Sequence, residues 1–415
     1  MLRKRIWICA TILLLFVAIG NAAALTNKEK LGKEIFFDKK LSINKNQACA
    51  ACHAPEVGFT GPDSIINVMG SVYEGSVAGR FGNRKPPAAA YAGDSPILYQ
   101  NISTGLWVGG MFWDGRATGW TLGDPLAEQA KGPFLNPMEQ GLPDASCVVY
   151  RVINSDYKHL YKQVWGELKV NWPKNVCSGV ATLSSMEEYN KVNEAYDNIA
   201  RSIAAYERST EVSSFTSKYD DYLKGKAKLT EQETRGLELF NNNSTAKCAN
   251  CHVPPLFTDF TYDNLGIPKN PMNPFYYEQM WNGLGGGIDW VDYGLGGFLN
   301  TTEYNVSAPV NNGKHKVPTL RNVDKRPYPE FIKAYGHNGY FKSLDQIVHF
   351  YNTRDVPGEG WNGVKWPAPE VSDNMNAAEM GNLGLTVSEE EDIVAFLKTL
   401  TDRDYDDHGK DVADN

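Results

Sequence analysis

The sequence is poor in the side chains that most often bind transition metals. Its 415 residues include seven histidines and seven cysteines, and no histidine lies between His53 and His159. Basic residues number 41 against 49 acidic ones, and the net charge of −8 disfavours nucleic acid as a partner. Apart from residues 6–19, no apolar run approaches the roughly 20 residues that a membrane span needs. With so few thiols and imidazoles, the position of each one is informative.

The N-terminus has the pattern of a secretory signal. A basic start at residues 3–5 precedes the apolar stretch 6–19, and three alanines at 22–24 offer a cleavage site before Leu25. We therefore predict a cleaved signal peptide over residues 1–24. The mature protein is expected in the periplasm or at the cell surface, without a membrane span. A retained membrane anchor is the alternative, although the apolar stretch is short for one.

Four of the seven cysteines form two copies of one motif, Cys-x-x-Cys-His. The copies are Cys49-Ala50-Ala51-Cys52-His53 and Cys248-Ala249-Asn250-Cys251-His252. This is the attachment signature of c-type haem, in which two thiols bond to the porphyrin and the adjacent histidine binds the iron. Zinc half-sites and redox dithiols also use cysteine pairs, but two motifs that each end in histidine favour two covalent haem c groups. We therefore predict that His53 and His252 are iron ligands.

The remaining cysteines bear on the compartment. Cys9 lies in the predicted signal peptide, which leaves Cys147 and Cys177 outside the motifs. Export places these two thiols in an oxidising compartment, where we expect them to pair as a disulfide. The alternative is two unrelated buried thiols.

A weak internal repeat surrounds the two haem motifs. Gly32-Lys33-Glu34-Ile35-Phe36 precedes the first motif and Gly236-Leu237-Glu238-Leu239-Phe240 precedes the second. A proline and then Phe-Thr follow each motif. The repeat predicts two related haem domains, an N-terminal one over residues 25–210 and a C-terminal one over residues 211–415.

Helix signals accompany the repeat. Thr26 with Glu29, and Thr230 with Glu233, fit capping boxes that open a helix before each motif. Apolar residues at helical spacing predict a long connecting helix over residues 185–210.

The C-terminal half adds two further expectations. Ser388 with Glu391 predict the cap of a last helix, whose buried stripe runs from Ile393 to Leu400. Residues 261–312 are dense in glycine and aromatic side chains, and we expect a structured insertion around the second haem. Few strands are expected, so the predicted fold class is mainly α.

Five further sequence blocks stand in a distinctive order. They are Phe112-Trp113-Asp114-Gly115-Arg116-Ala117, Glu128-Gln129-Ala130-Lys131-Gly132-Pro133, Asn136-Pro137-Met138-Glu139, Lys316-Val317-Pro318-Thr319-Leu320-Arg321-Asn322-Val323 and His337-Asn338-Gly339. Together they resemble the bacterial di-haem cytochrome c peroxidase superfamily, which includes MauG-type enzymes that oxidise residues of a partner protein. The resemblance covers nearly the whole mature chain. It implies two class I cytochrome c-like domains with loop-rich insertions and haems at or near the domain interface.

The resemblance also implies residue roles. Trp113 matches a tryptophan between the haems that helps electrons to pass, although a core aromatic in a tight turn is the alternative. Gln129 and Glu139 match a pair over the open face of the N-terminal haem. Peroxide must lose a proton from one oxygen and gain one on the other, and a carboxylate beside the iron can carry out both transfers. The amide of Gln129 would orient the peroxide.

The chain departs from the usual pattern at the distal positions of both haems. Val77 stands where typical peroxidases of the superfamily carry a blocking histidine. Met69 is the only nearby candidate for a soft ligand, and a methionine in a loop more often serves in packing. We therefore expect the first haem to be open without activation. Tyr351 stands where high-potential members carry a methionine ligand, and MauG-type enzymes use a tyrosine there. An oxygen ligand lowers the reduction potential. His349 and Met380 are the rival ligands.

A third departure concerns calcium. The superfamily's calcium site between the domains uses an asparagine where this chain has Lys85. An ammonium group would repel the cation, so calcium is doubtful, although Asn83 and backbone carbonyls could build a weaker site. His337 is expected to form hydrogen bonds near the interface and not to bind iron.

The sequence thus favours an exported di-haem oxidoreductase that reduces hydrogen peroxide at the N-terminal haem and receives the electrons for this reaction through the C-terminal haem. Its electron donor would be a small cytochrome c or copper protein. The alternative is a MauG-like enzyme that oxidises tryptophan or tyrosine in a protein substrate. An electron-transfer protein with two six-coordinate haems is a third hypothesis. A homodimer is left open.

Overall fold

The computed structural model describes residues 24–283 and 286–403. The predicted signal peptide falls outside them except for residue 24. The described chain is mainly helical, as predicted, and its strands are two residues long. In the part of the chain that the structure describes, no helix is both long enough and apolar enough to cross a membrane.

The secondary structure consists of helices joined by long ordered loops. The helices are α1 (Asn27–Phe37), α2 (Ser64–Val68), α3 (Pro125–Leu135), α4 (Ala145–Ile153), α5 (Lys158–Trp165), α6 (Met186–Glu207), α7 (Lys218–Leu223), α8 (Glu231–Phe240), α9 (Phe275–Asn282), α10 (Gly294–Leu299), α11 (Leu344–Thr353) and α12 (Val387–Lys398). Three antiparallel pairs join β1 (Tyr99–Gln100) to β2 (Trp107–Val108), β3 (Tyr262–Asp263) to β4 (His315–Lys316), and β5 (Gly360–Trp361) to β6 (Val364–Lys365).

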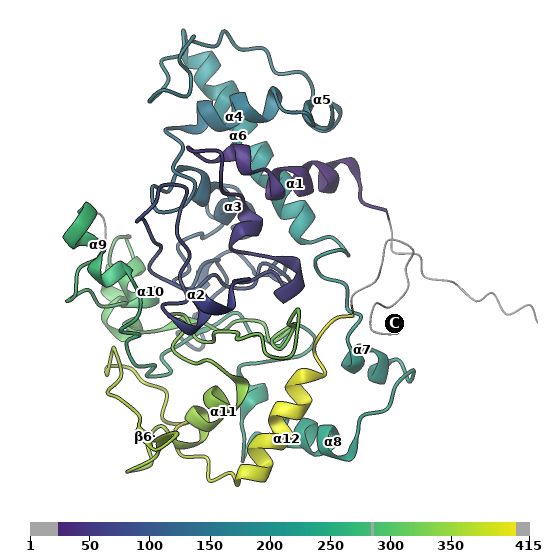
Figure 1. Cartoon of the computed structure of the whole chain (residues 1–415), viewed down its shortest axis with the longest axis vertical. Coiled ribbons are helices and arrows are strands. Elements are labelled where there is room, and N and C mark those ends of the chain that lie inside the picture. The colour runs from purple at the N-terminus through teal and green to yellow at the C-terminus, as the bar shows by residue number, and fades with distance from the viewer. Residues whose placement is uncertain (1–23, 284–285, 404–415) are drawn as a thin grey trace, which may run out of the picture.

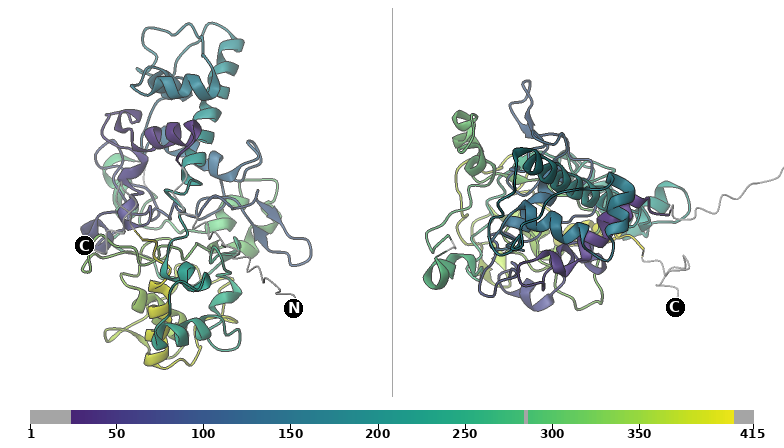
Figure 2. Two further views of the ribbon diagram at one scale, coloured as in Figure 1. Left: turned by 90° about the vertical axis from the view of Figure 1, so that its right-hand side faces the viewer. Right: turned by 90° about the horizontal axis from the view of Figure 1, so that it is seen from above.

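Two hydrophobic cores lie at opposite ends of the long axis (Figure 1). Helices α1, α4 and α6 enclose the first, and α8, α11 and α12 enclose the second. In the first core Phe36 packs edge-on against Tyr206, with ring centroids 5.5 Å apart. In the second, Phe240 lies 5.1 Å from Phe396. The left view of Figure 2 shows from another side that the helices of the two cores remain separate.

Each core is built on the same crossing of two helices. A methyl group at Gly32 of α1 would lie 1.9 Å from the carbonyl oxygen of Ser202 in α6. At Gly236 of α8 it would lie 1.9 Å from the carbonyl oxygen of Asp392 in α12. Only glycine allows backbones to approach this closely. The weak repeat in the sequence therefore corresponds to a repeated helix crossing.

The predicted helix starts are confirmed except at the last helix. Capping boxes at Thr26 and Thr230 open α1 and α8, and Ser185 caps the long helix α6. The predicted cap at Ser388 and Glu391 is wrong: Thr386 and Glu389 form the capping box, two residues earlier. Both pairs fit the capping pattern. The earlier pair starts α12 at Val387, which places Glu389 and Glu390 in the first turn of the helix. The predicted stripe of α12 is buried as expected.

The expected disulfide is present: Cys147 in α4 is bonded to Cys177. The insertion at residues 261–312 is structured in its described part, which contains β3, α9 and α10. Its side chains Tyr262, Leu295 and Leu299 form a small core of their own with Trp107. The insertion therefore packs against the N-terminal half.

Buried polar side chains join the two halves. Lys333 donates to the carbonyl of Val57 at 2.9 Å, and Asn67 donates to the carbonyl of Ile332 at 3.0 Å. Arg84 forms a bidentate ion pair with Asp292, at 2.6 and 2.7 Å. The halves are therefore connected by charged and amide groups as well as by apolar contacts.

The C-terminal end of the described chain closes over the same interface. The carboxylate of Asp402 accepts hydrogen bonds from the Tyr91 hydroxyl (2.6 Å), the Thr216 amide (3.0 Å) and the Asn322 side chain (2.9 Å). Asn322 in turn accepts from the Asp402 amide at 2.8 Å. Asp402 thus joins three segments that are far apart in the sequence.

Candidate functional site

Both Cys-x-x-Cys-His motifs form a short 3-10 turn followed by a histidine in a fixed orientation. Nδ1 of His53 lies 3.1 Å from the carbonyl oxygen of Phe59, and Nδ1 of His252 lies 2.9 Å from that of Phe257. Because a carbonyl only accepts hydrogen bonds, Nδ1 carries the proton and Nε2 keeps its lone pair for a metal. Burial lowers the pKa of His53 to about 4, which keeps the imidazole neutral. The four motif cysteines have free thiols.

The segments that flank the two histidines are also equivalent. The Thr60 hydroxyl donates to the carbonyl of Pro86, and the Thr258 hydroxyl donates to the carbonyl of Val317, both at 2.7 Å. Each acceptor follows a buried or partly buried lysine, Lys85 in the first case and Lys316 in the second. The two sites therefore share local geometry that the motif alone did not predict.

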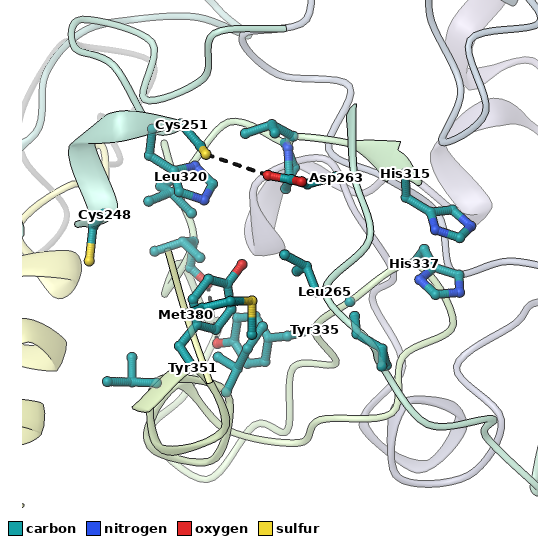
Figure 3. A pocket seen from close by; sticks show the side chains of 18 of the residues that line it. Cys248, Cys251, Asp263, Leu265, His315, Leu320, Tyr335, His337, Tyr351 and Met380 are labelled. Carbon is teal, nitrogen blue, oxygen red and sulfur yellow. Dashed lines mark hydrogen bonds between the residues drawn. The ribbon is translucent and has the colours of Figure 1, made fainter. Parts of the chain in front are cut away.

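A cavity of about 220 Å³ extends from the second motif toward the interface. Its lining is mostly apolar and includes Cys248, Cys251, His252 and the side chains of α11 and α12. Tyr351 and Met380 lie together on one wall of it (Figure 3). Burial, reinforced by Cys251 and Asp263, raises the pKa of the Tyr351 hydroxyl.

His349, the other predicted rival ligand, points away from this cavity. Its Nδ1 lies 3.0 Å from both carboxylate oxygens of Glu390, and its Nε2 lies 3.9 Å from Glu359. Its ring contacts Trp361 and Trp366. Of the three candidate ligands predicted from the sequence, Tyr351 and Met380 line the cavity and His349 does not.

Glu139 lies close to the first motif. It follows α3 in a turn held by the hydrogen bond of its amide to the Asn136 carbonyl, and its carboxylate acts electrostatically on both Cys49 and Cys52. Burial raises the pKa of Glu139, while Arg116 and Asn136 oppose the shift. Gln129 is half-buried on α3, two turns before this loop.

The loop around Val77 packs directly on the turn that carries Glu139. The Ser76 amide donates to the Glu139 carbonyl at 2.7 Å, and a methyl group at Gly75 would lie 2.4 Å from the carbonyl oxygen of Met138. Met69, the soft ligand considered from the sequence, is 46% exposed at the end of α2. Val77 has no side-chain donor atom, and nearly half of Met69 is exposed to solvent.

Trp113 is buried between the two halves. Its Nε1 donates to the carbonyl of Lys85 at 2.8 Å, and its own carbonyl accepts from the Lys316 amide at 2.9 Å. Its ring meets His337 edge-on, with centroids 6.5 Å apart. The pKa of His337 is held well below its usual range by burial and by the neighbouring His315.

Lys85 occupies the position at which the resemblance implies a calcium ligand. Its ammonium donates to the Thr60 hydroxyl and the Pro86 carbonyl, both at 2.9 Å. Burial, with a contribution from Lys342, lowers its pKa to about 8. The backbone carbonyl of Asn83 accepts from Asn273. A cation of the protein itself thus stands at this position.

Three buried polar groups near the first motif were missed by sequence reasoning. Gln47 donates to the Glu74 carbonyl and lies 3.9 Å from the Cys52 sulfur. Both amide atoms of Gln140 are buried without a hydrogen-bond partner among the described residues. Burial raises the pKa of Glu207 to about 8, and this carboxyl acts on Cys49. The only sequence signal was adjacency, since Gln47 precedes the motif by two residues and Gln140 follows Glu139.

Comparisons with known proteins give one consistent result. The family model for the di-haem cytochrome c peroxidase matches residues 26–228. The methylamine utilization protein MauG of Paracoccus denitrificans is 33% identical over 91% of this chain and 89% of its own. The cytochrome-c peroxidase IdrP1 of Denitromonas iodatirespirans is 27% identical over 90% and 81%. The solved diheme peroxidase BthA of Burkholderia thailandensis is 28% identical over 91% and 86%, with a TM-score of 0.71.

Proposed function

The chain belongs to the di-haem cytochrome c peroxidase family, and we propose that it is an exported enzyme that reduces hydrogen peroxide to water at an N-terminal haem. A second haem c would be attached to the C-terminal motif. The two cores correspond, in this proposal, to class I cytochrome c-like domains over residues 25–210 and 211–415. The repeated glycine crossing and the repeated histidine geometry support this division.

The residues present fit two haem groups. Each motif offers two free thiols for the thioether bonds and one imidazole whose Nδ1 is fixed by a carbonyl. The largely apolar cavity beside His252 suits a porphyrin face. When bound, the haems supply the iron chemistry and store the two oxidising equivalents of one peroxide.

Glu139 is the group proposed to move the proton at the first haem. Its carboxylate would accept the proton from one peroxide oxygen, and its acid form would return a proton to the other oxygen so that water leaves. A raised pKa suits a carboxyl that must hold the proton between these steps. Gln129 would orient the peroxide, and the pairing of Arg116 with Asp114 keeps a cation beside Glu139.

Trp113 is the group proposed to connect the two sites. It lies in the interface, forms hydrogen bonds with the backbone of Lys85 and of Lys316, and lines the cavity of the second motif. Its Nε1 hydrogen bond to Lys85 fixes the ring in place, which suits a residue that electrons must pass.

The test of this proposal is peroxide consumption by the holoprotein, purified with two haems per chain, using a reduced small cytochrome c or copper protein as donor. We expect stoichiometric oxidation of two donor equivalents per peroxide. A holoprotein whose haem absorption is indifferent to peroxide would leave only electron transfer and refute the proposal.

A second candidate function is favoured by one observation, the position of Tyr351 in the second cavity. A tyrosine oxygen on the iron stabilises the oxidised state and lowers the reduction potential. Such a haem would accept electrons poorly from an ordinary donor. The oxidising equivalents would then be kept and delivered to a tryptophan or tyrosine of a partner protein, as in a MauG-like enzyme.

Two matched variants decide this point. Tyr351→Phe should raise the potential of the second haem by on the order of 100 mV, within the range of about 0.8 V over which axial ligands act. Met380→Leu, in the same wall, should leave that potential nearly unchanged. The reverse result, with a large effect at Met380 and none at Tyr351, would favour the peroxidase with an external donor.

A further inference from the structure

Four buried side chains converge at the interface between the halves, in the lining of the cavity that extends from the second haem motif. Asp292 precedes α10, His315 lies in β4, and His337 and Glu370 lie in loops of the C-terminal half. One ligand atom from each of Asp292, His315 and His337 lies within 4.8 Å of the other two. Figure 3 shows the two imidazoles one above the other, away from Tyr351 and Met380.

The distances between these groups are too long for most hydrogen bonds but suit the edges of a metal polyhedron. Nε2 of His315 lies 3.3 Å from Oδ1 of Asp292. Nε2 of His337 lies 3.9 Å from Oδ2 of Asp292 and 4.0 Å from Oε2 of Glu370. Metal bonds of about 2.0–2.2 Å place neighbouring ligand atoms about 3.4 Å apart in a tetrahedron.

The proton positions point in the same direction. Nδ1 of His315 lies 3.0 Å from the carbonyl oxygen of Gly313 and must donate to it, so the neutral ring presents a lone pair to a carboxylate. Three atoms have no hydrogen-bond partner among the described residues: Nε2 of His315, Nε2 of His337 and Oε2 of Glu370. Unpaired buried polar atoms are costly and rare. Nε2 of His337 lies near both of the others, so one bound group could serve as a shared partner for all three.

A proton alone does not supply that partner. An imidazolium at His315 could pair with Asp292, yet Nε2 of His337 and Oε2 of Glu370 would stay unpartnered. Glu370 already accepts from the Asp292 amide through Oε1 and stands near the Tyr276 hydroxyl. A haem propionate is disfavoured as well, because it would meet two carboxylates.

We propose that Asp292, His315, His337 and Glu370 bind one divalent first-row transition-metal ion. Two imidazoles with two carboxylates suit zinc or iron(II), whereas calcium takes oxygen ligands and is disfavoured by the two imidazoles. Arg84 would act through Asp292: its bidentate ion pair fixes the carboxylate and links the site to the N-terminal half. Asp114 lies 2.6 Å from Arg84 and offsets part of the guanidinium charge. The repulsion between Arg84 and a bound dication is therefore reduced.

The two stacked imidazoles give the site a definite position in the molecule. Their ring centroids are 3.5 Å apart, and His337 meets Trp113 on its other side. The ion would therefore fix the rings that border the proposed path between the haems. Its binding is independent of the proposed peroxide chemistry, so each can fail without the other.

The experiment uses holoprotein with two haems per chain, treated with a chelator, desalted, and dialysed against 1 µM free Zn²⁺. We expect about one zinc per chain by elemental analysis, and a zinc absorption edge with scattering from two imidazoles. Millimolar Ca²⁺ should not displace it. Bound zinc well below one per chain, or displacement by calcium, would overturn the proposal without any variant.

Variants then locate the site. His315→Gln and Glu370→Gln should each weaken zinc binding at least tenfold while the haem absorption spectrum is kept. His159→Gln, at an exposed histidine of α5, is the matched control and should bind zinc like the wild type. Undiminished binding in both interface variants would place the zinc elsewhere and refute the assignment. If one variant fails to fold, the other and the wild-type edge spectrum still decide.

Discussion

The half around His53 and the half around His252 are built on the same frame but hold different contents. Both have a glycine crossing of two helices, a 3-10 turn with two free thiols, and a histidine fixed through Nδ1 by a phenylalanine carbonyl. The N-terminal half adds a carboxyl, Glu139, next to its motif. The C-terminal half adds a cavity wall with Tyr351 and Met380.

This difference teaches where the function is encoded. In the proposed function, the frame positions two similar cofactors, and loops outside the frame decide which of them meets peroxide and which is closed. The turn after α3 and the loop around Val77 carry the contents of the first site, while α11 and the loop before α12 carry those of the second.

The largest effect is expected on the rate of reaction with peroxide, when one glutamate near the haem motif of each half is replaced by glutamine. Glu139→Gln should slow the reaction of the holoprotein with peroxide by about 10²–10⁴-fold, the usual value of general acid–base catalysis. Glu379→Gln, at a carboxyl 3.8 Å from the Cys251 sulfur, should change it less than about tenfold. Stopped-flow absorbance measures both. Because the pKa of Glu139 is raised, the wild-type rate should fall as pH is lowered through that pKa, and Glu139→Gln should lose this dependence.

Comparable slowing by both exchanges would show that the two halves share the chemistry.

A smaller effect is expected on stability. Burial raises the pKa of Glu207 from its ordinary value, 4.5, to about 8. Between these two pH values the folded chain holds a proton on Glu207 that the unfolded chain has released. The free energy of unfolding should therefore fall as pH rises through this range. Glu207→Gln should remove this fall, worth on the order of 5 kcal/mol at pH 9. Urea midpoints at pH 5 and pH 9 measure the effect.

Asp263→Asn is the matched change in the other half. Burial raises the pKa of Asp263 too, but Asn376 donates to its carboxylate at 3.0 Å, so its effect should be smaller. A larger effect of Asp263→Asn than of Glu207→Gln would contradict the assignment.

The smallest and most symmetrical effect concerns the frame itself. Gly32→Ala and Gly236→Ala each force a methyl group against a carbonyl oxygen, and overpacking of this kind costs about 1–3 kcal/mol, occasionally more. Thermal unfolding of the two variants should show similar losses. A loss confined to one half would mean that the two crossings are not equivalent.

Sequence reasoning predicted the frame well because its signals are local. Capping boxes at Thr26 and Thr230, the apolar period of α6 and the spacing of the haem motifs each depend on residues within a few turns. The misplaced cap of α12 shows the limit: two overlapping patterns fit, and packing selected Thr386.

The contents of the sites were harder to predict because they depend on long-range contacts. Glu139 was identified through its sequence block, but nothing local predicted that Glu207 would lose its hydration near Cys49. Asp292, His315 and His337 come from three separate segments, and only folding brings one ligand atom of each within 4.8 Å of the other two. His349 was a reasonable rival to Tyr351 until Glu390 was seen to hold it.

The hydrogen bonds that Asp402 forms across the interface have a consequence for how the molecule matures. Tyr91 belongs to the N-terminal half and Asn322 to the C-terminal half, yet both depend on a carboxylate that is synthesised near the end of the chain. In a chain exported as proposed, the first haem motif would emerge long before the residues that close the interface. Haem could then be attached to the first motif while that interface is still open, until residue 402 arrives and the interface forms.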